Sequence, residues 1–184
     1  LQGEERIERP VCSDALMTTF LDQLPFRLTA AQSRVLKDIC HDMTASSPMN
    51  RLIQGDVGCG KTIVAMSAAV RVCSTGQQAA FMVPTELLAE QHYRNFRTRL
   101  EAIGIRVALI RGGMRAKEKR EILAAVAEGA IQVVIGTHAI FQNTVRFARL
   151  GFVVIDEQHR FGVLQRKALV EKGSRPDVLV MTAT

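Results

Sequence analysis

One segment constrains the fold of this chain more than any other. It runs from Gly55 to Thr62, reads GDVGCGKT, and lies between the apolar run Leu52-Ile53 and a stretch with helical spacing. Phosphate oxygens need several backbone N–H groups that point into one small concavity, which glycines permit, and a helix start adds the positive end of its dipole. The pattern GxxxxGKT in this context predicts a strand, a phosphate-binding loop and a helix in direct succession.

The residues of this loop have separate predicted roles in binding ATP and Mg²⁺. Lys61 supplies a point charge to the outer phosphates, and the Thr62 hydroxyl binds the magnesium ion. The alternative, a glycine-rich turn without a ligand, is disfavoured by the flanking strand and helix. The backbone that surrounds the phosphates belongs to Gly55, Asp56, Val57, Gly58, Cys59 and Gly60. Cys59 is most simply a small residue that fits, although the helix start could also activate its thiol toward alkylation.

Two acids follow the apolar run Phe152 to Ile155, about a hundred residues after the loop. Carboxylates at the end of a buried strand are costly unless a cation meets them. Asp156 is suited to hold magnesium, usually through a water, and Glu157 to orient and deprotonate the water that attacks the terminal phosphate. The pair therefore favours hydrolysis over transfer of phosphate to a small molecule. The alternative is that both acids begin a solvated helix.

The apolar pattern predicts the fold class. Short continuous runs rich in Val and Ile are typical of strands covered on both faces, and they lie at 79–83, 107–110, 131–135, 152–155 and 178–181. Stretches with helical spacing lie at 29–43, where Thr29 is the expected N-cap, and at 61–73, 86–102, 115–128 and 164–172. This alternation predicts an α/β fold with a mostly parallel sheet and helices on both faces, and ligands at the connections.

Composition excludes several classes of protein. A formal net charge of +6 and a pI near 9.5 favour a polyanionic partner without specifying the fold. The cysteines at positions 12, 40, 59 and 73 form no CxxC pair, so neither a zinc site nor a disulfide framework is indicated, and a reducing cytoplasm is the simpler expectation. No apolar run reaches the ~20 residues that a membrane helix needs, so we expect no membrane partner.

Four further segments resemble motifs of the superfamily of DNA and RNA helicases with RecA-like motor domains. They stand in the order of that family around GDVGCGKT and DEQH, and they are LPFRLTAAQ at 24–32, PTELLAEQH at 84–92, GTH at 136–138 and TAT at 182–184. The resemblance covers the chain from about residue 24 to its last residue. It implies a RecA-like P-loop NTPase fold and an ATP-dependent helicase activity.

The resemblance also implies roles for individual residues. Gln32 would read the adenine edge while Phe26 lies against its ring, and His159 would join the catalytic residues. The residues implied to track DNA are Pro84, Thr85, Arg111, Gly112, Gly136, Thr137 and His138. Those implied to couple the two ligands are Gln158, Arg160, Thr182 and Thr184. Most other basic residues fit a solvated helix face, so among the arginines only Arg111 and Arg160 are expected to matter for DNA.

Within this superfamily the sequences of these motifs most resemble those of a bacterial translocase. That translocase remodels branched DNA, such as stalled forks and Holliday junctions, in recombination and repair. The transcription-repair coupling factor shares GDVG, GKT and HRFGV, but Gln158 and the pair Pro25-Phe26 favour the first reading. That resemblance implies branched DNA, a second RecA-like domain and an N-terminal wedge domain as partners. We expect residues 24–184 to be the first motor domain, nearly inactive alone, and residues 1–23 to be a linker or lead-in helix.

Two other functions remain open from the residues themselves. One is a P-loop hydrolase that does not bind nucleic acid, and the other is a regulatory nucleotide-binding module without turnover. DNA-stimulated ATP hydrolysis would separate a DNA translocase from both.

Overall fold

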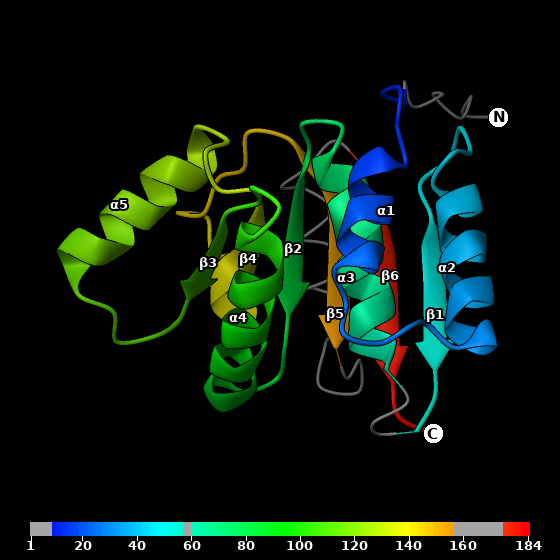
Figure 1. The fold of residues 1–184 in the computed structure, drawn as a ribbon. Coiled ribbons are helices and arrows are strands. Elements are labelled where there is room, and N and C mark those ends of the chain that lie inside the picture. The colour runs from blue at the N-terminus through cyan, green and yellow to red at the C-terminus, as the bar shows by residue number, and fades with distance from the viewer. Residues whose placement is uncertain (1–8, 57–59, 157–174) are drawn as a thin grey trace, which may run out of the picture.

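The computed structural model describes residues 9–56, 60–156 and 175–184. In these residues six strands form one parallel sheet in the order β1-β6-β5-β2-β4-β3. The strands are β1 (Asn50–Gln54), β2 (Gln78–Met82), β3 (Val107–Ile110), β4 (Val133–Gly136), β5 (Leu150–Asp156) and β6 (Asp177–Thr182). Because they all run the same way, their carboxyl ends lie along one edge, the lower edge in Figure 1. We call this edge the rim.

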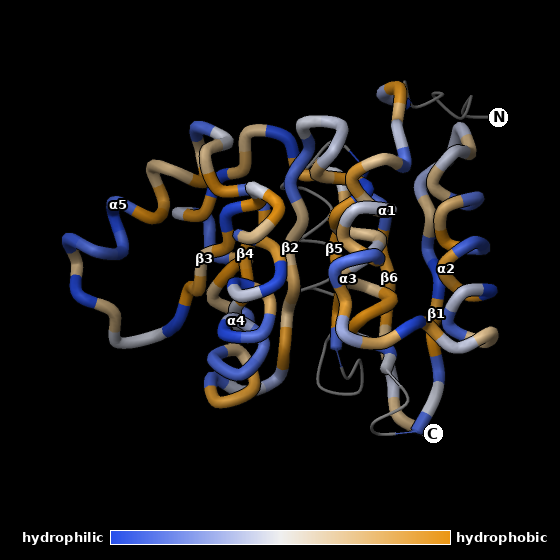
Figure 2. Tube along the Cα trace, viewed as in Figure 1, coloured by the Kyte–Doolittle hydropathy of each residue, from blue (hydrophilic) through white to orange (hydrophobic). Residues whose placement is uncertain are grey.

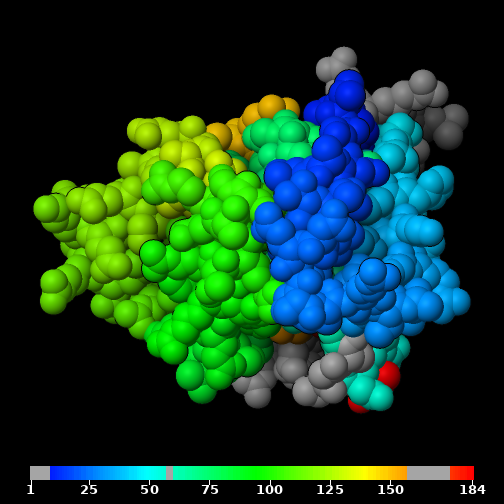
Figure 3. Space-filling model, in the orientation of Figure 1, coloured from blue at the N-terminus to red at the C-terminus, as the bar shows by residue number. Residues whose placement is uncertain are grey.

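Helices cover both faces of the sheet, as the alternation of runs predicts. One face packs against α1 (Ala15–Asp22), α2 (Ala30–Asp42), α3 (Lys61–Cys73) and α4 (Glu86–Glu101). Figure 3 shows α4 beside α1 and α2 on the surface of this face. The other face packs, among the described residues, against the 3₁₀ helix η1 (His138–Phe141) and α5 (Ala116–Ala127). Helix α5 stands out from the body of the molecule in Figure 1.

The apolar runs are continuous because alternate side chains enter two different cores. In β5, Phe152 and Val154 join the core under α3, whereas Val153 and Ile155 join the core on the opposite face, and all four are fully buried. Strand side chains alternate between the faces of a sheet, so a strand covered on both sides needs an apolar residue at every position. The apolar centre of the molecule is visible in Figure 2.

Local signals located the helices closely. The expected helix Lys61 to Cys73 has the bounds of α3. Thr29 caps α2, because its hydroxyl accepts a hydrogen bond from Gln32 N at 3.1 Å while Thr29 N donates to Gln32 Oε1 at 2.9 Å. This reciprocal arrangement satisfies two backbone donors at the helix start. The helix expected at 164–172 lies outside the described residues.

The segment before residue 24 packs onto the domain. Helix α1 lies against α3, and Phe20 is buried in their shared core. The boundary expected at residue 24 stays a prediction. None of the helices in the described ranges is long and apolar enough to span a membrane.

Candidate nucleotide site and nucleic-acid rim

Strand order divides the rim into two halves. The carboxyl ends of β1, β6 and β5 carry Gly55, Thr184 and Asp156, and we call them the nucleotide half. The carboxyl ends of β2, β4 and β3 lead into Pro84, His138 and Arg111, and we call them the loop half. Strands β5 and β2 are neighbours, so the two halves meet at the centre of the sheet. The fold thus brings the motifs of the sequence to one edge, with those expected to bind ATP beside those expected to bind DNA.

The phosphate-binding loop ends at Gly60, which precedes α3 in a left-handed conformation with φ of 80°. This positive φ favours glycine, and a Cβ at this position would lie 2.1 Å from Gln32 Nε2 unless that side chain moved. The side chain of Gln32 therefore lies against the loop. Lys61 Nζ donates to Gly55 O at 2.5 Å and to Asp56 O at 3.0 Å. Residues 57–59, which include the predicted positions Val57, Gly58 and Cys59, lie outside the described residues.

The end of β6 is bound to the same loop. Gly55 N donates a hydrogen bond to Thr182 O at 3.2 Å. The Thr184 hydroxyl donates to the Asp56 carboxylate. Thr182 and Thr184, which the resemblance assigns to coupling, are therefore in direct contact with the phosphate-binding loop.

Asp156 lies at the point where the two halves meet. Its side chain is 20% exposed, and its Oδ2 lies 3.6 Å from Nε2 of His92, which belongs to α4 and so to the loop half. The sequence analysis missed this contact, because nothing in the order of the motifs indicates that β2 lies beside β5. Glu157, Gln158, His159 and Arg160 lie outside the described residues.

The side chains present fit a magnesium ion. The Thr62 hydroxyl and the Asp156 carboxylate both offer oxygen, the donor that Mg²⁺ prefers. Within the described ranges there is no group of three or more His, Cys, Asp or Glu side chains that could hold a metal. Magnesium usually keeps several waters and takes phosphate oxygens beside one or two protein ligands.

Phe26 is placed on the surface, where a flat ligand can reach it. Its ring is 45% exposed, and the guanidinium carbon of Arg99 in α4 lies 5.7 Å from the ring centroid. Arg99 in turn donates to the Asn95 side chain at 2.9 Å. The stacking of adenine on Phe26 stays a prediction.

The GTH segment is mostly buried. Gly136 is the last residue of β4, and a Cβ there would lie 2.5 Å from both Ile110 O and Ile140 Cγ2. Thr137 is only 7% exposed, whereas His138 is exposed. Gly136 is therefore required for close packing of β4 against β3 and η1. Of the three residues expected to contact DNA here, His138 is the one whose side chain a ligand can reach.

The remaining loops contact helix α4. Pro84 is partly buried, and the exposed Thr85 caps α4 by accepting a hydrogen bond from Leu88 N at 3.3 Å. After β3, Arg111 forms an ion pair with Glu90. Gly112 N donates to Glu86 Oε1 at 2.9 Å, and a Cβ on Gly112 would collide with that oxygen. Both acids lie inside the PTELLAEQH segment, but no role was predicted for either, and their i, i+4 spacing places them on one face of the helix.

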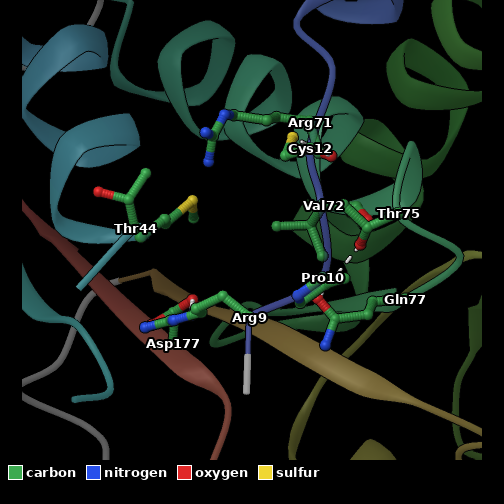
Figure 4. Close-up of a pocket in the computed structure, with 10 residues that line it drawn as sticks. Arg9, Pro10, Cys12, Thr44, Arg71, Val72, Thr75, Gln77 and Asp177 are labelled. Atoms are coloured by element: carbon green, nitrogen blue, oxygen red, sulfur yellow. Dashed lines mark hydrogen bonds and ion pairs between the residues drawn. The ribbon is translucent and has the colours of Figure 1, made fainter. Parts of the chain in front are cut away.

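The opposite edge of the sheet carries a separate polar cluster that no motif indicated. The buried Asp177 carboxylate accepts from Arg9 Nη1 at 2.6 Å, from Arg9 Nη2 at 3.0 Å and from Met49 N at 2.7 Å. Beside this pair lies a cavity of about 210 Å³, also lined by Cys12, Arg71 and Gln77 (Figure 4). The cluster fixes the segment before α1 to the start of β6, at the other end of the strands from the rim.

The fold and the rim define a class of protein that the family comparison identifies. The sequence profile of the DEAD/DEAH box helicases matches residues 29–184, from the N-cap of α2 to the last residue of the chain. The chain therefore belongs to the DEAD/DEAH box helicase family. The resemblance to the helicase superfamily, which rests on the order of the motifs, is confirmed.

Within this family the chain is similar to the ATP-dependent DNA helicase RecG. It is 48% identical to RecG of Aquifex aeolicus (strain VF5) over 183 residues, which are 98% of this chain and 23% of that protein. It is 51% identical to RecG of Escherichia coli (strain K12) over 176 residues, which are 94% of this chain and 25% of that protein. The chain thus spans about a quarter of the length of these relatives.

The fold agrees with this similarity. The solved structure of RecG bound to a three-way DNA junction superposes on this chain with a TM-score of 0.83 and 46% sequence identity, covering 94% of this chain and 23% of that one. The predicted fold class, a RecA-like domain with a parallel sheet and helices on both faces, is confirmed.

Proposed function

We propose that the protein containing this chain is an ATP-driven DNA helicase that remodels branched DNA such as stalled forks and Holliday junctions. Residues 24–184 would be its first RecA-like motor domain. The observation that carries the proposal is the rim, in which the phosphate-binding loop and Asp156 share one sheet edge with the loops after β2, β4 and β3. The similarity to RecG over nearly the whole chain supports DNA as the second ligand.

ATP would bind at the nucleotide half. Lys61 Nζ, which now contacts the carbonyls of Gly55 and Asp56, would turn to the outer phosphates, and the start of α3 would add its backbone donors. Thr62 and Asp156 would hold magnesium, whose positive charge offsets the charge that develops on the transferred phosphate. Phe26 and Gln32 would contact the adenine.

Hydrolysis would depend on the acid that follows Asp156. Glu157 would orient and deprotonate the attacking water, and His159 would act with it among the catalytic residues. Gln158, Arg160, Thr182 and Thr184 would pass the state of the nucleotide to the loops. Thr182 and Thr184 already contact the phosphate-binding loop, which supports their part in this proposal.

DNA would cross the loop half. Arg111 and His138 offer exposed side chains there, Thr85 is exposed at the start of α4, and Gly112 offers a backbone N–H. Contacts to phosphates position a strand without reading its sequence, which suits a motor that must move along any sequence. A second RecA-like domain and a wedge domain of the same protein would complete the motor, and we propose that it works in the bacterial cytoplasm.

Strand separation tests this function. The full-length protein would be mixed with a three-way junction that carries one fluorescent strand, with ATP and Mg²⁺ or with a non-hydrolysable ATP analogue. We expect release of the labelled strand with ATP and Mg²⁺ but not with the analogue. A Lys61→Ala variant should release no strand. Hydrolysis of ATP that is indifferent to the junction, with no strand released, would contradict the proposal and leave a P-loop hydrolase without a nucleic-acid substrate.

A further inference from the structure

We propose that helix α4 makes DNA binding and ATP hydrolysis depend on each other, because its acids occupy the donors that a DNA phosphate needs while its His92 positions Asp156. This inference rests on the proposed function and names the element that regulates it. Three side chains of one helix carry it. Glu86 and Glu90 face the loop after β3, and His92 faces the nucleotide half of the rim.

The acids of α4 stand where phosphate oxygens would bind. Arg111 pairs with Glu90, and the backbone N–H of the next residue, Gly112, donates to Glu86 Oε1 at 2.9 Å. A guanidinium and a backbone N–H bind carboxylate and phosphate oxygens alike, so the two adjacent donors suit an anion. The Arg111 and Glu90 side chains are 47% and 33% exposed, so a DNA strand can reach them. A phosphate must therefore displace the carboxylates of α4.

The same helix contacts the nucleotide half two residues further on. His92 Nε2 lies 3.6 Å from Asp156 Oδ2, just beyond the range of a direct hydrogen bond. The His92 ring packs edge-on against Phe96 with centroids 5.9 Å apart, and the fully buried Phe96 packs in the same way on Phe81 of β2 at 4.6 Å. The ring therefore moves with α4, which the contact of Phe96 with Phe81 packs on β2. A small shift of the helix decides whether His92 holds the Asp156 carboxylate.

These contacts link the two ligands through one rigid element. When a DNA phosphate takes Arg111 and Gly112, the first two turns of α4 lose their ties to the loop and the helix resettles against β2, which changes the distance from His92 to Asp156. Because coupling between two binding sites is reciprocal, magnesium and ATP at Asp156 in turn change the affinity of the loop for DNA. His92 is a positioning residue in this scheme, and the acids are internal competitors of DNA.

DNA affinity of the full-length protein tests the competition. The probe is a fluorescein-labelled three-way junction, and binding is followed by fluorescence anisotropy. Glu90→Gln keeps the shape of the side chain but removes the charge that competes for Arg111. We expect binding about two- to fivefold tighter, the range that an exposed ion pair contributes.

Glu101→Gln is the matched control. Glu101 lies on the same helix and also pairs with an arginine, Arg97 at 3.2 Å. Among the described residues it forms no hydrogen bond or ion pair with the loop after β3 or with Asp156. It should bind the junction as the unchanged protein does. Equal affinities for Glu90→Gln and Glu101→Gln would overturn the competition.

The ratio of ATP hydrolysis rates with and without the junction tests the link to Asp156. His92→Leu removes the ring nitrogen, and we expect the ratio to fall about fivefold or more, the lower end of the typical coupling between two sites. His92→Gln keeps an N–H donor and should restore part of the ratio, which a merely structural role of His92 does not predict. A ratio in His92→Leu that equals that of the unchanged protein would overturn the link.

These outcomes distinguish failure of the proposed function from failure of the role of α4. If the unchanged protein shows a ratio of one, the proposed function itself fails. If its ratio is large while Glu90→Gln matches Glu101→Gln and His92→Leu keeps the full ratio, the DNA motor stands and the role of α4 alone is refuted.

Discussion

The two halves of the rim are held in different ways. In the nucleotide half, the phosphate-binding loop is tied to β6 by a backbone hydrogen bond from Gly55 to Thr182, and Lys61 binds backbone carbonyls of the loop. In the loop half, Arg111 and Gly112 are held by the carboxylates of one helix. Backbone contacts between paired strands persist as long as the sheet does, whereas exposed ion pairs exchange with solvent and ligands at little cost. The contacts that hold the nucleotide half are thus fixed by the sheet, whereas those that hold the loop half can be exchanged for contacts to a ligand. We call the first the fixed half and the second the exchangeable half.

The largest effect is expected in the fixed half. Lys61→Ala removes the side-chain charge nearest the predicted phosphates, and we expect junction-stimulated ATP hydrolysis by the full-length protein to fall about 10²–10³-fold, as when one electrostatic donor is removed from an active site. Lys117→Ala, on the exposed surface of α5, is the matched control and should change the rate little. An equal loss in both variants would mean that the rate depends on the net positive charge of the protein and not on a specific contact of Lys61.

Gly136 tests whether every part of the loop half is exchangeable. Gly136→Ala places a Cβ 2.5 Å from Ile110 O and Ile140 Cγ2, so we expect a loss of unfolding free energy of about 1–3 kcal/mol from overpacking. Denaturant melts of the full-length protein measure it. Gly104→Ala is the control, because it has a positive φ of 83° but open space around it, and it should cost about 1 kcal/mol. If Gly136→Ala melts with unchanged stability yet loses DNA binding, Gly136 acts in DNA binding and not in packing.

The exchangeable half should respond to salt. Arg111→Ala removes one expected phosphate contact, so junction affinity should fall severalfold and the slope of log affinity against log salt should decrease by about one. Arg97→Ala, which removes an arginine already paired with Glu101 on the same face, should leave that slope unchanged. Identical slopes in all three proteins would place the DNA path away from the loop after β3.

The smallest effect concerns thiol chemistry. Burial raises the pKa of the Cys73 thiol to about 12, so at pH 8 roughly one thiol in ten thousand is ionised and Cys73 should resist iodoacetamide. Cys59 is expected to label faster and to be shielded by ATP, and mass spectrometry of the labelled peptides measures both. Labelling of Cys59 that ATP does not slow would remove the support for an activated thiol in the phosphate-binding loop.

The sequence predicted the parts of the fold that depend on local signals. The bounds of α3, the Thr29 cap and the strands covered on both faces follow from neighbours along the chain. It also predicted a mostly parallel sheet with ligands at its connections. That the ATP and DNA motifs share one edge emerges from the structure, because the carboxyl ends of all six described strands lie on the same side.

Contacts between distant elements could not be predicted in this way. Sequence order does not reveal that β2 lies beside β5, so the approach of His92 to Asp156 was missed. Burial of Thr137 and the packing role of Gly136 depend likewise on the neighbouring β3 and on η1. The predicted roles of Glu157 to Arg160 stay predictions.

If the two halves of the rim work together, ATP hydrolysis at one half responds to DNA at the other. The most direct test is the ATP hydrolysis rate of the full-length protein with and without a synthetic replication fork, beside a Glu157→Gln variant. The account predicts strong stimulation by the fork that vanishes in the variant. A rate that is indifferent to DNA would contradict the account and leave an ATP hydrolase without a nucleic-acid partner.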